Sequence, residues 1–436
     1  MQSVESNVIL SNTESVCPVC LRVVPAEIVV WEQAVYQKKV CPEHGLVTTY
    51  LWPDVDHYQW MKDFHFPFKK PQGPIAAQEG CPRDCGLCTS HLRHPTLVEI
   101  ELTQRCNMRC PVCFMAADEA QAAAPDDPDM LAFEGMYKAI LAKTGPEISI
   151  QLTGGEPTIR KDLPDIVRLG RRCGFNAIEV NTNGMVIAHD RAYLERLAEA
   201  GISGIYLQFD GLTGEVYEKI RGKDILNDKL KAIENCRAVG VQVVLAMTVI
   251  AGVNHDQMGA VLDFALQNRD VIAGIAYQPA FGSGRFEVAA HRRLTMGDVI
   301  FQLAEQSQGL LQPYDFWPLG CSHPLCDTAT YIVEEQGIQK PLTRLITKEQ
   351  YADCFDPDSP QGSVFPDIAD KMFPHLNPGL SIVIMNFMDA MSMDLKRLRE
   401  CSMTVTGPDG RIVPFCVYQL TNIDGKKMSE LPHPSR

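Results

Sequence analysis

Between about residues 96 and 290, short apolar runs alternate with longer stretches in which apolar residues recur at helical spacing. This alternation is typical of parallel α/β architecture. Helices are expected between the strands, and those at 191–200 and 228–239 each end near a glycine, as a helix stop should. Because polar residues follow strand after strand, the pattern favours an α/β fold with a partial (β/α)6 TIM-like barrel over a doubly wound sheet. The six predicted strands are 97–102, 148–152, 177–181, 204–209, 242–249 and 274–278.

The sections on either side of this barrel have different patterns. Residues 1–60 hold a strand-like stretch between two cysteine-containing turns, which predicts a small rubredoxin-like or zinc-ribbon-like domain. Residues 61–95 form a proline-rich linker that carries closely spaced cysteines. With the barrel assigned to residues 96–294, we expect residues 295–436 to be a C-terminal auxiliary iron–sulfur domain, since five more cysteines are scattered there.

Composition narrows the classes of function. The formal net charge of −14 over 436 residues argues against a nucleic-acid binder, since such proteins concentrate Lys and Arg to displace counterions. A secretory signal is not apparent, and the longest apolar run, 240–253, is shorter than the roughly 20 residues that span a bilayer. We therefore expect a cytoplasmic protein without a transmembrane segment. In such a chain, 16 cysteines in tight clusters indicate metal ligation rather than disulfides.

The first cysteine cluster predicts a mononuclear metal site. Cys17-Pro-Val-Cys20 and Cys41-Pro-Glu-His44 are two turns separated by a strand-like stretch, and a hairpin there would bring their ligand atoms together. His44 has the spacing of a fourth ligand, which favours zinc. A cysteine from elsewhere in that position would make the site more suited to iron.

A second cluster lies in the linker. Cys81, Cys85 and Cys88 are spaced so that three thiolates can bind one face of a four-iron four-sulfur (4Fe-4S) cluster, with a fourth ligand from elsewhere. Structural zinc is the alternative for this triplet.

The third cluster follows the first barrel strand, in Cys106-Asn-Met-Arg-Cys110-Pro-Val-Cys113. Three cysteines supply only three ligands to a 4Fe-4S cluster, so one iron is left open. The Cys-x3-Cys-x2-Cys spacing resembles that of the radical S-adenosylmethionine (SAM) superfamily. The resemblance implies that SAM binds the open iron through its amino and carboxylate groups and is cleaved to a 5'-deoxyadenosyl radical.

Three more motifs, which follow the second, third and fourth barrel strands, are similar to segments that contact SAM in that superfamily. Leu152-Thr-Gly-Gly-Glu-Pro-Thr158 follows the second strand, where the glycines allow close backbone approach and the glutamate offers a charge partner. The segment 277–285 is compatible with an adenine contact, but a plain strand-exit loop fits it as well. The candidate SAM-binding residues are Gly154, Gly155, Glu156, Pro157, Asn181, Asn183, Gln208 and Asp210.

The flanking cysteine motifs, together with 386–401 and 410–416, resemble the archaeal tetraether lipid synthases and the related class D radical SAM methylases. That resemblance implies a SAM-binding 4Fe-4S cluster, two auxiliary 4Fe-4S clusters and one mononuclear zinc or iron. Cys173 and Cys236 lie in barrel helices, where they are expected to be buried hydrophobic residues. The expected auxiliary ligands, with Cys354 the weakest of them, are Cys81, Cys85, Cys88, Cys321, Cys326, Cys354, Cys401 and Cys416.

By the same resemblance, the radical abstracts hydrogen from an unactivated sp3 carbon and a carbon–carbon bond forms between lipid chains. The apolar, methionine-rich stretch 380–393 is either part of an alkyl-chain tunnel or simple core packing. One alternative is methylation of an aromatic or heterocyclic carbon with a methyl carbon from a reduced folate or pterin. Another is a peptide-modifying maturase, and a non-catalytic electron carrier is a third. The expected partners are a small-molecule or lipid substrate and an electron donor such as flavodoxin or ferredoxin. We expect a monomer with, at most, transient membrane contact.

Overall fold

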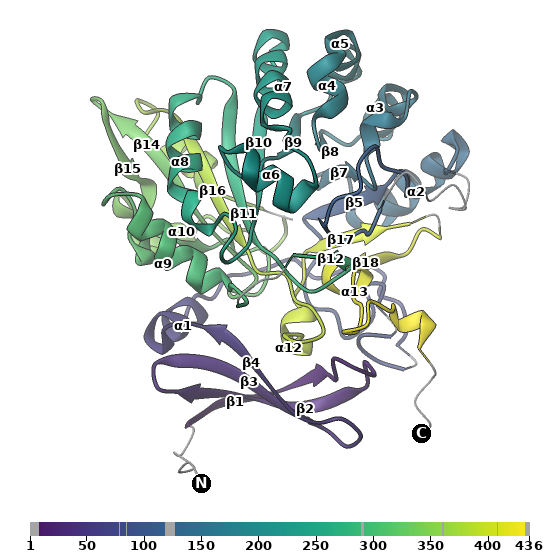
Figure 1. Cartoon of the computed structure of the whole chain (residues 1–436), viewed down its shortest axis with the longest axis vertical. Coiled ribbons are helices and arrows are strands. Elements are labelled where there is room, and N and C mark those ends of the chain that lie inside the picture. The colour runs from purple at the N-terminus through teal and green to yellow at the C-terminus, as the bar shows by residue number, and fades with distance from the viewer. Residues whose placement is uncertain are drawn as a thin grey trace.

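The computed structural model describes residues 8–77, 79–83, 85–117, 127–288, 292–359, 362–407 and 409–431. Two larger sheets organise the chain: a four-stranded antiparallel sheet near the N-terminus and a 12-stranded sheet above it in Figure 1. No helix in the described part of the chain is long and apolar enough to cross a membrane.

The small sheet contains four strands paired in chain order: β1 (Val8–Val16), β2 (Val23–Trp31), β3 (Ala34–Cys41) and β4 (Gly45–Trp52). Residues of β2 alternate between buried and exposed, as expected for a strand with one face on a core. The strand-like stretch between the cysteine turns is therefore a hairpin, with its turn at residues 32–33. It places both cysteine-containing turns at the same end of the sheet, and helix α1 (Val55–Lys62) follows.

All six predicted barrel strands are present, parallel and adjacent in the expected order. Helices lie on their outer side, and the buried apolar faces of most of them form one large core with the strands. The partial barrel predicted from the sequence is confirmed. The strands are β5 (Leu97–Glu101), β7 (Ser149–Thr153), β8 (Ala177–Thr182), β9 (Gly204–Gln208), β10 (Val243–Val249) and β11 (Ile272–Pro279). The helices are α2 (Met130–Thr144), α3 (Leu163–Arg172), α4 (Met185–His189), α5 (Arg191–Ala200), α6 (Gly214–Arg221), α7 (Leu226–Val239) and α8 (Met258–Gln267).

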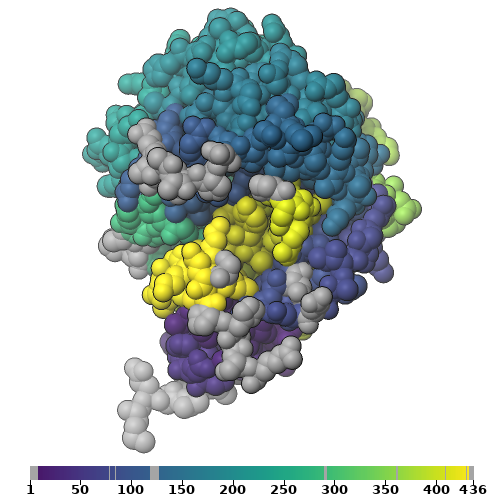
Figure 2. Space-filling view, turned by 90° about the vertical axis from the view of Figure 1, so that its right-hand side faces the viewer, coloured from purple at the N-terminus to yellow at the C-terminus, as the bar shows by residue number. Residues whose placement is uncertain are grey.

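The C-terminal section extends this sheet at both ends. β16 (Asn377–Met385) pairs in parallel with β11, and β17 (Met403–Thr406) pairs in parallel with β5. Eight parallel strands thus run in sequence, and residues 386–402 connect the two outermost. Figure 2 shows the C-terminal residues (yellow) lying between the small N-terminal sheet (purple) and the barrel (blue and teal). The domain limits proposed above stay predictions, but the sheet itself is continuous across residue 295.

The remaining elements flank this frame. β14 (Asp327–Glu335) is antiparallel to β16 on its outer side, and β18 (Ile412–Pro414) is antiparallel to β17. The other strands are β6 (Val112–Cys113), β12 (Arg285–Phe286), β13 (Trp317–Pro318) and β15 (Ile338–Pro341). The other α-helices are α9 (Met296–Gln306), α10 (Lys348–Ala352), α11 (Phe365–Met372), α12 (Leu395–Leu398) and α13 (Phe415–Tyr418).

The small sheet is joined to the C-terminal section by buried polar contacts. Lys39 on β3 donates to the carbonyl oxygens of Ala390 (2.7 Å) and Met391 (2.9 Å). Gln37 donates to the carbonyl of Met393 at 3.0 Å. Lys39 is almost fully buried, and desolvation lowers its pKa to about 8. A buried ammonium is stable only with such partners, so these contacts fix the small sheet against the loop 389–393.

Candidate active site

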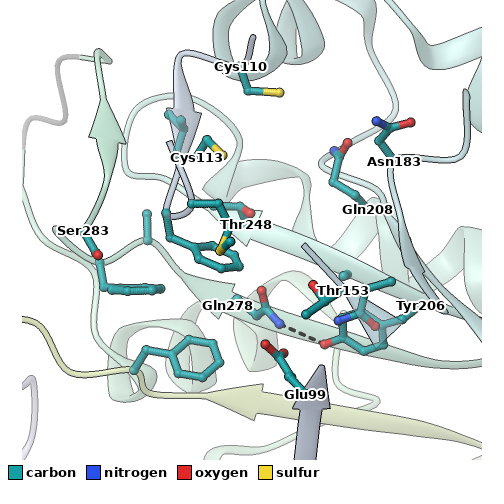
Figure 3. Close-up of a pocket in the computed structure, with 18 of the residues that line it drawn as sticks. Glu99, Cys110, Cys113, Thr153, Asn183, Tyr206, Gln208, Thr248, Gln278 and Ser283 are labelled. Carbon is teal, nitrogen blue, oxygen red and sulfur yellow. Dashed lines mark hydrogen bonds between the residues drawn. The ribbon is translucent and has the colours of Figure 1, made fainter. Parts of the chain in front are cut away.

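A cavity of about 200 Å³ lies at the carboxyl ends of the barrel strands (Figure 3). Each of the six predicted strands, or the loop that follows it, contributes to the wall, and β16 and β17 add Met385 and Met403. This is the end of a parallel barrel where active sites are found. Among the sequence-predicted residues, those that line it are Cys106, Cys110, Cys113, Gly154, Gly155, Glu156, Asn181, Asn183 and Gln208.

The three cysteines of the first loop face this cavity together. The loop leaves β5 and returns as β6, which pairs with β12 so that Cys113 lies opposite Arg285. The Arg285 guanidinium donates to the carbonyl oxygens of Cys110 (3.0 Å) and Ala116 (2.8 Å). Arg285, part of the segment considered above as an adenine contact, therefore braces the cysteine loop through its backbone.

The two glycines after β7 are required by close packing of two loops. A Cβ at Gly155 would collide with the carbonyl oxygen of Arg105, and one at Gly154 with that of Thr103. The Gly155 amide donates to the Thr103 carbonyl at 2.7 Å, and the Glu156 amide donates to the Arg105 carbonyl at 2.9 Å. The glycine loop is thus held directly against the backbone that leads to the cysteines.

Glu156 is buried, and both oxygens of its carboxylate accept hydrogen bonds from the protein. One oxygen accepts hydrogen bonds from Thr158 and from the Thr182 hydroxyl (2.6 Å), and the other accepts from the Asn183 amide at 2.7 Å. Pro157 begins the short helical turn that follows and does not line the cavity. Glu156 therefore ties the loop after β7 to the loop after β8, in addition to presenting negative charge to the cavity wall.

Asp210 has a different position from the one expected. Its side chain is fully buried and pairs with Arg221 on α6 through two hydrogen bonds, of 2.7 and 2.9 Å. Arg221, not Asp210, lines the cavity, and it also donates to the carbonyl oxygen of Val112 in the cysteine loop at 3.0 Å. Asp210 therefore acts on the cavity through the arginine that it holds.

Lys229 is a second cation that the sequence analysis missed. Its ammonium donates to Gln208 Oε1 at 2.7 Å and to the carbonyl oxygen of Asn183. Full burial lowers its pKa to about 7, although Asp210 acts in the opposite direction. A signal was available, because Lys229 lies on the apolar stripe of α7 with Ile233 and Cys236. A lysine in that position needs buried acceptors.

Opposite the cysteines, the inner faces of the strands form a polar floor. Gln278 Nε2 donates to the Tyr206 hydroxyl at 2.9 Å (Figure 3), and Gln151 links Asn181 (3.3 Å) to Glu179 (2.9 Å). Glu99 on β5 also lines the cavity from this side, as Figure 3 shows.

One wall is aromatic. The rings of Phe387 and Phe415 have centroids 4.5 Å apart, and those of Phe281 and Phe387 are 5.3 Å apart. All three line the cavity together with Met385. Met388 and Met393, by contrast, belong to the buried core beside it. The methionine-rich stretch therefore contributes partly to the cavity and partly to core packing.

The auxiliary cysteines fall into neighbouring groups. The thiol of Cys81 lies beside those of Cys85 and Cys88. Cys326, Cys401 and Cys416 line a separate cavity of about 40 Å³, where Arg397 donates to Cys326 Sγ at 3.5 Å. Cys354 is not among the described residues that line that cavity. Its thiol donates to the Gln350 carbonyl at 3.2 Å. Cys321 is partly buried, and its thiol contacts the side chains of Thr96 and of Ser402, which lines the same cavity.

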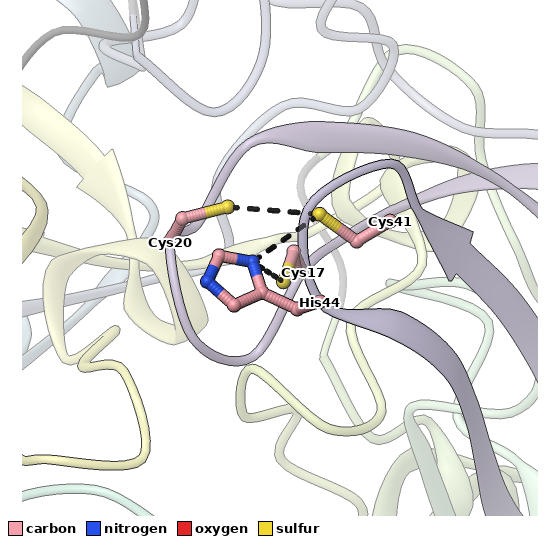
Figure 4. A group of neighbouring side chains, drawn as sticks. All are labelled: Cys17, Cys20, Cys41 and His44. Atoms are coloured by element: carbon pink, nitrogen blue, oxygen red, sulfur yellow. Dashed lines mark hydrogen bonds between the residues drawn. The ribbon is translucent and has the colours of Figure 1, made fainter.

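The N-terminal cysteines and His44 form a compact cluster (Figure 4). The ligand atoms of Cys17, Cys20, Cys41 and His44 all lie within 4.8 Å of one another. His44 Nδ1 is 3.4 Å from Cys41 Sγ and 3.6 Å from Cys17 Sγ. Three thiolates and one imidazole at these separations suit tetrahedral zinc, and His44 completes the set as the sequence spacing predicted.

Replacing Cys41 with alanine is expected to remove one zinc atom per chain and to lower the thermal unfolding midpoint, because three ligands hold structural zinc poorly. Zinc content by elemental analysis, with iron measured in the same sample, checks this. Cys173→Ala, far from the cluster, is the matched control and should keep its zinc. Unchanged zinc in Cys41→Ala would contradict the assignment.

Comparison with known proteins gives matches over both sheets. The radical SAM superfamily model matches residues 100–265, and the model described as the HMPTM N-terminal zinc ribbon domain matches residues 9–53. The 7,8-dihydro-6-hydroxymethylpterin dimethyltransferase of Methanocaldococcus jannaschii is 33% identical over 93% of this chain and 92% of its own length. The molybdenum cofactor biosynthesis protein moc-5 of Caenorhabditis elegans is 31% identical over 45% of this chain and 32% of its own.

Among solved structures, the FeFe-hydrogenase maturase HydG from Carboxydothermus hydrogenoformans aligns with a TM-score of 0.41 and 15% identity, over 50% of this chain and 52% of that one.

Proposed function

We propose that this chain, which belongs to the radical SAM superfamily, methylates a reduced pterin or a closely related bicyclic heterocycle. It belongs to the same family as the archaeal 7,8-dihydro-6-hydroxymethylpterin dimethyltransferase. The observation that carries the proposal is the cavity, which has three thiols at one end, a polar floor at the other and an aromatic wall between them. A flat heterocycle with polar edges has the chemistry to fill such a space.

The same cavity argues against the lipid-coupling hypothesis favoured by sequence. An alkyl chain would leave the Glu99 carboxyl and Asn181 Oδ1 without hydrogen-bond partners, and each unpaired polar group is costly. The full-length relative is named as a pterin dimethyltransferase, which supports the methylation alternative. The peptide-maturase alternative gains no support from the N-terminal region, which matches a zinc ribbon.

The residues present fit a 4Fe-4S cluster with SAM bound. Cys106, Cys110 and Cys113 come from one loop and face one cavity, which Gly154 and Gly155 also line. When bound, the cluster and SAM would supply the 5'-deoxyadenosyl radical. Glu156 and Arg221 would hold charged groups of SAM, because one presents a buried carboxylate and the other a guanidinium to the same space.

We extend the proposal to two auxiliary clusters. Cys81, Cys85 and Cys88 would hold one, and Cys326, Cys401 and Cys416 the other, with Cys321 next to it. Cys354 is the candidate with least support. An external electron donor such as flavodoxin or ferredoxin, and a monomeric state, stay predictions.

The proposal is tested by anaerobic turnover of the fully loaded protein with SAM, a reductant, a reduced folate or pterin as methyl source, and 7,8-dihydro-6-hydroxymethylpterin as acceptor. We expect the acceptor to gain the mass of one or two methylene units, and 5'-deoxyadenosine to accumulate with it. An unchanged acceptor in samples that do form 5'-deoxyadenosine would overturn pterin methylation.

A further inference from the structure

Glu99 is a buried carboxyl group in the cavity floor that has no hydrogen-bond partner among the described residues. It lies in the middle of β5, its side chain is 4% exposed, and it points into the cavity toward Gln278 and Tyr206 (Figure 3). The next inward-facing carboxyl on the strand, that of Glu101, accepts a hydrogen bond from the Tyr418 hydroxyl at 2.8 Å. A carboxyl with no protein partner is costly unless something else binds it, so the cavity is where a ligand group would meet Glu99.

A second acceptor that lines the same cavity, on β8 two strands away, is also unsatisfied. The Oδ1 atom of Asn181 is buried without a partner, while its Nδ2 atom is used to donate to Gln151. Gln151 in turn donates to Glu179, so this chain of amides fixes the direction in which Asn181 points its acceptor. Native interiors rarely leave such atoms unpaired. The floor therefore has two acceptor groups, the Glu99 carboxyl and Asn181 Oδ1, to which no described residue donates.

The ligand chemistry that complements this floor is a ring edge with neighbouring N–H donors. An ionised carboxylate can accept from two adjacent N–H groups, such as a ring N–H and an exocyclic amino group. Burial, and then the Glu101 carboxylate, raise the pKa of Glu99 to about 8. The protonated acid also fits such an edge, because it can donate to a ring nitrogen and accept from the amino group.

The rest of the cavity is consistent with this orientation. The aromatic wall of Phe281, Phe387 and Phe415 can stack on a flat ring whose edge reaches the floor. Cys110 and Glu99 lie at opposite ends of the view in Figure 3. The ring edge remote from the floor would then face the cysteine loop.

We infer that Glu99, together with Asn181 two strands away in the same cavity, selects the substrate by binding the amino and N–H edge of a 2-aminopyrimidine-type ring. This inference rests on the proposed function and names the residue that recognises the heterocycle.

The test measures binding of 7,8-dihydro-6-hydroxymethylpterin to the anaerobic, cluster-loaded protein by fluorescence titration. Glu99→Leu is expected to weaken binding by about 10- to 100-fold, the loss that corresponds to removing hydrogen bonds to a charged group. Its KM for the pterin should rise, whereas kcat at saturating pterin should change less. Glu101→Leu, the same change two residues away on the same strand face, should bind the pterin as the wild type does.

Two results distinguish the possible failures. If the wild type methylates the pterin and Glu99→Leu binds it equally well, the role of Glu99 is refuted and the proposed function stands. If the wild type neither binds nor methylates the pterin, the proposed function is refuted, and the role of Glu99 is refuted with it. Should Glu99→Leu not fold, Glu99→Ala, which leaves room for water, gives the same comparison.

Discussion

Replacing Cys110 with alanine is expected to abolish reductive cleavage of SAM, leaving 5'-deoxyadenosine at the level of a protein-free control. Cys110 faces the cavity with Cys106 and Cys113 on a loop that Arg285 braces through the Cys110 carbonyl. Because Arg285 donates to the backbone carbonyl of residue 110, this hydrogen bond remains in the variant. The substitution therefore removes only a thiolate. Two remaining thiolates would hold a 4Fe-4S cluster too weakly for turnover.

The measurement is 5'-deoxyadenosine by liquid chromatography after anaerobic incubation with SAM and reductant, with iron content determined in parallel. Cys173→Ala is the matched control, since Cys173 lies at the end of α3 in an outer helix of the barrel. It should retain both iron and activity. Wild-type rates in Cys110→Ala would refute the assignment of the SAM-binding cluster.

Asp210→Ala is expected to have the largest effect on stability. It would leave the Arg221 guanidinium buried without its counter-ion, and removing one partner of a buried pair costs about 3–5 kcal/mol. Arg221 also holds the cysteine loop through the Val112 carbonyl, so SAM cleavage should fall as well. A reduced thermal unfolding midpoint, recorded at equal cluster content, checks the stability effect.

The matched control is Asp270→Ala, which removes an aspartate from an exposed pair with Arg237. Exposed ion pairs contribute little, so its midpoint should stay close to that of the wild type. Equal midpoints for the two variants would contradict the role of the buried pair.

Local patterns predicted much of the fold. Each of the six barrel strands combines an apolar run with a turn or helix signal, so each strand can be predicted from residues that are close together in the sequence. β16 and β17 were not predicted as barrel strands, because β17 pairs with β5 across some 300 residues of chain and no local pattern encodes that partner. For the same reason the C-terminal section was expected to form a separate domain, whereas its strands continue the sheet.

The cysteine clusters could be found because ligand spacing is a local property. The roles of single polar residues could not, since Asp210 and Glu156 reveal their partners only when loops from different strands meet. Glu99 carried a usable signal that was not used, a carboxylate between the apolar residues Val98 and Ile100 of a predicted strand. Choosing between lipid coupling and heterocycle methylation required the cavity itself and the full-length relative.

The central claim is that the radical acts on a polar heterocycle inside the barrel. The most direct measurement supplies 7,8-dihydro-6-hydroxymethylpterin and an archaeal ether lipid together in anaerobic turnover with SAM, a reductant and a reduced folate as methyl source. Mass spectrometry then identifies which of the two candidate substrates changes. We expect a methylated pterin and an unchanged lipid. Coupled lipid chains beside an unchanged pterin would contradict it.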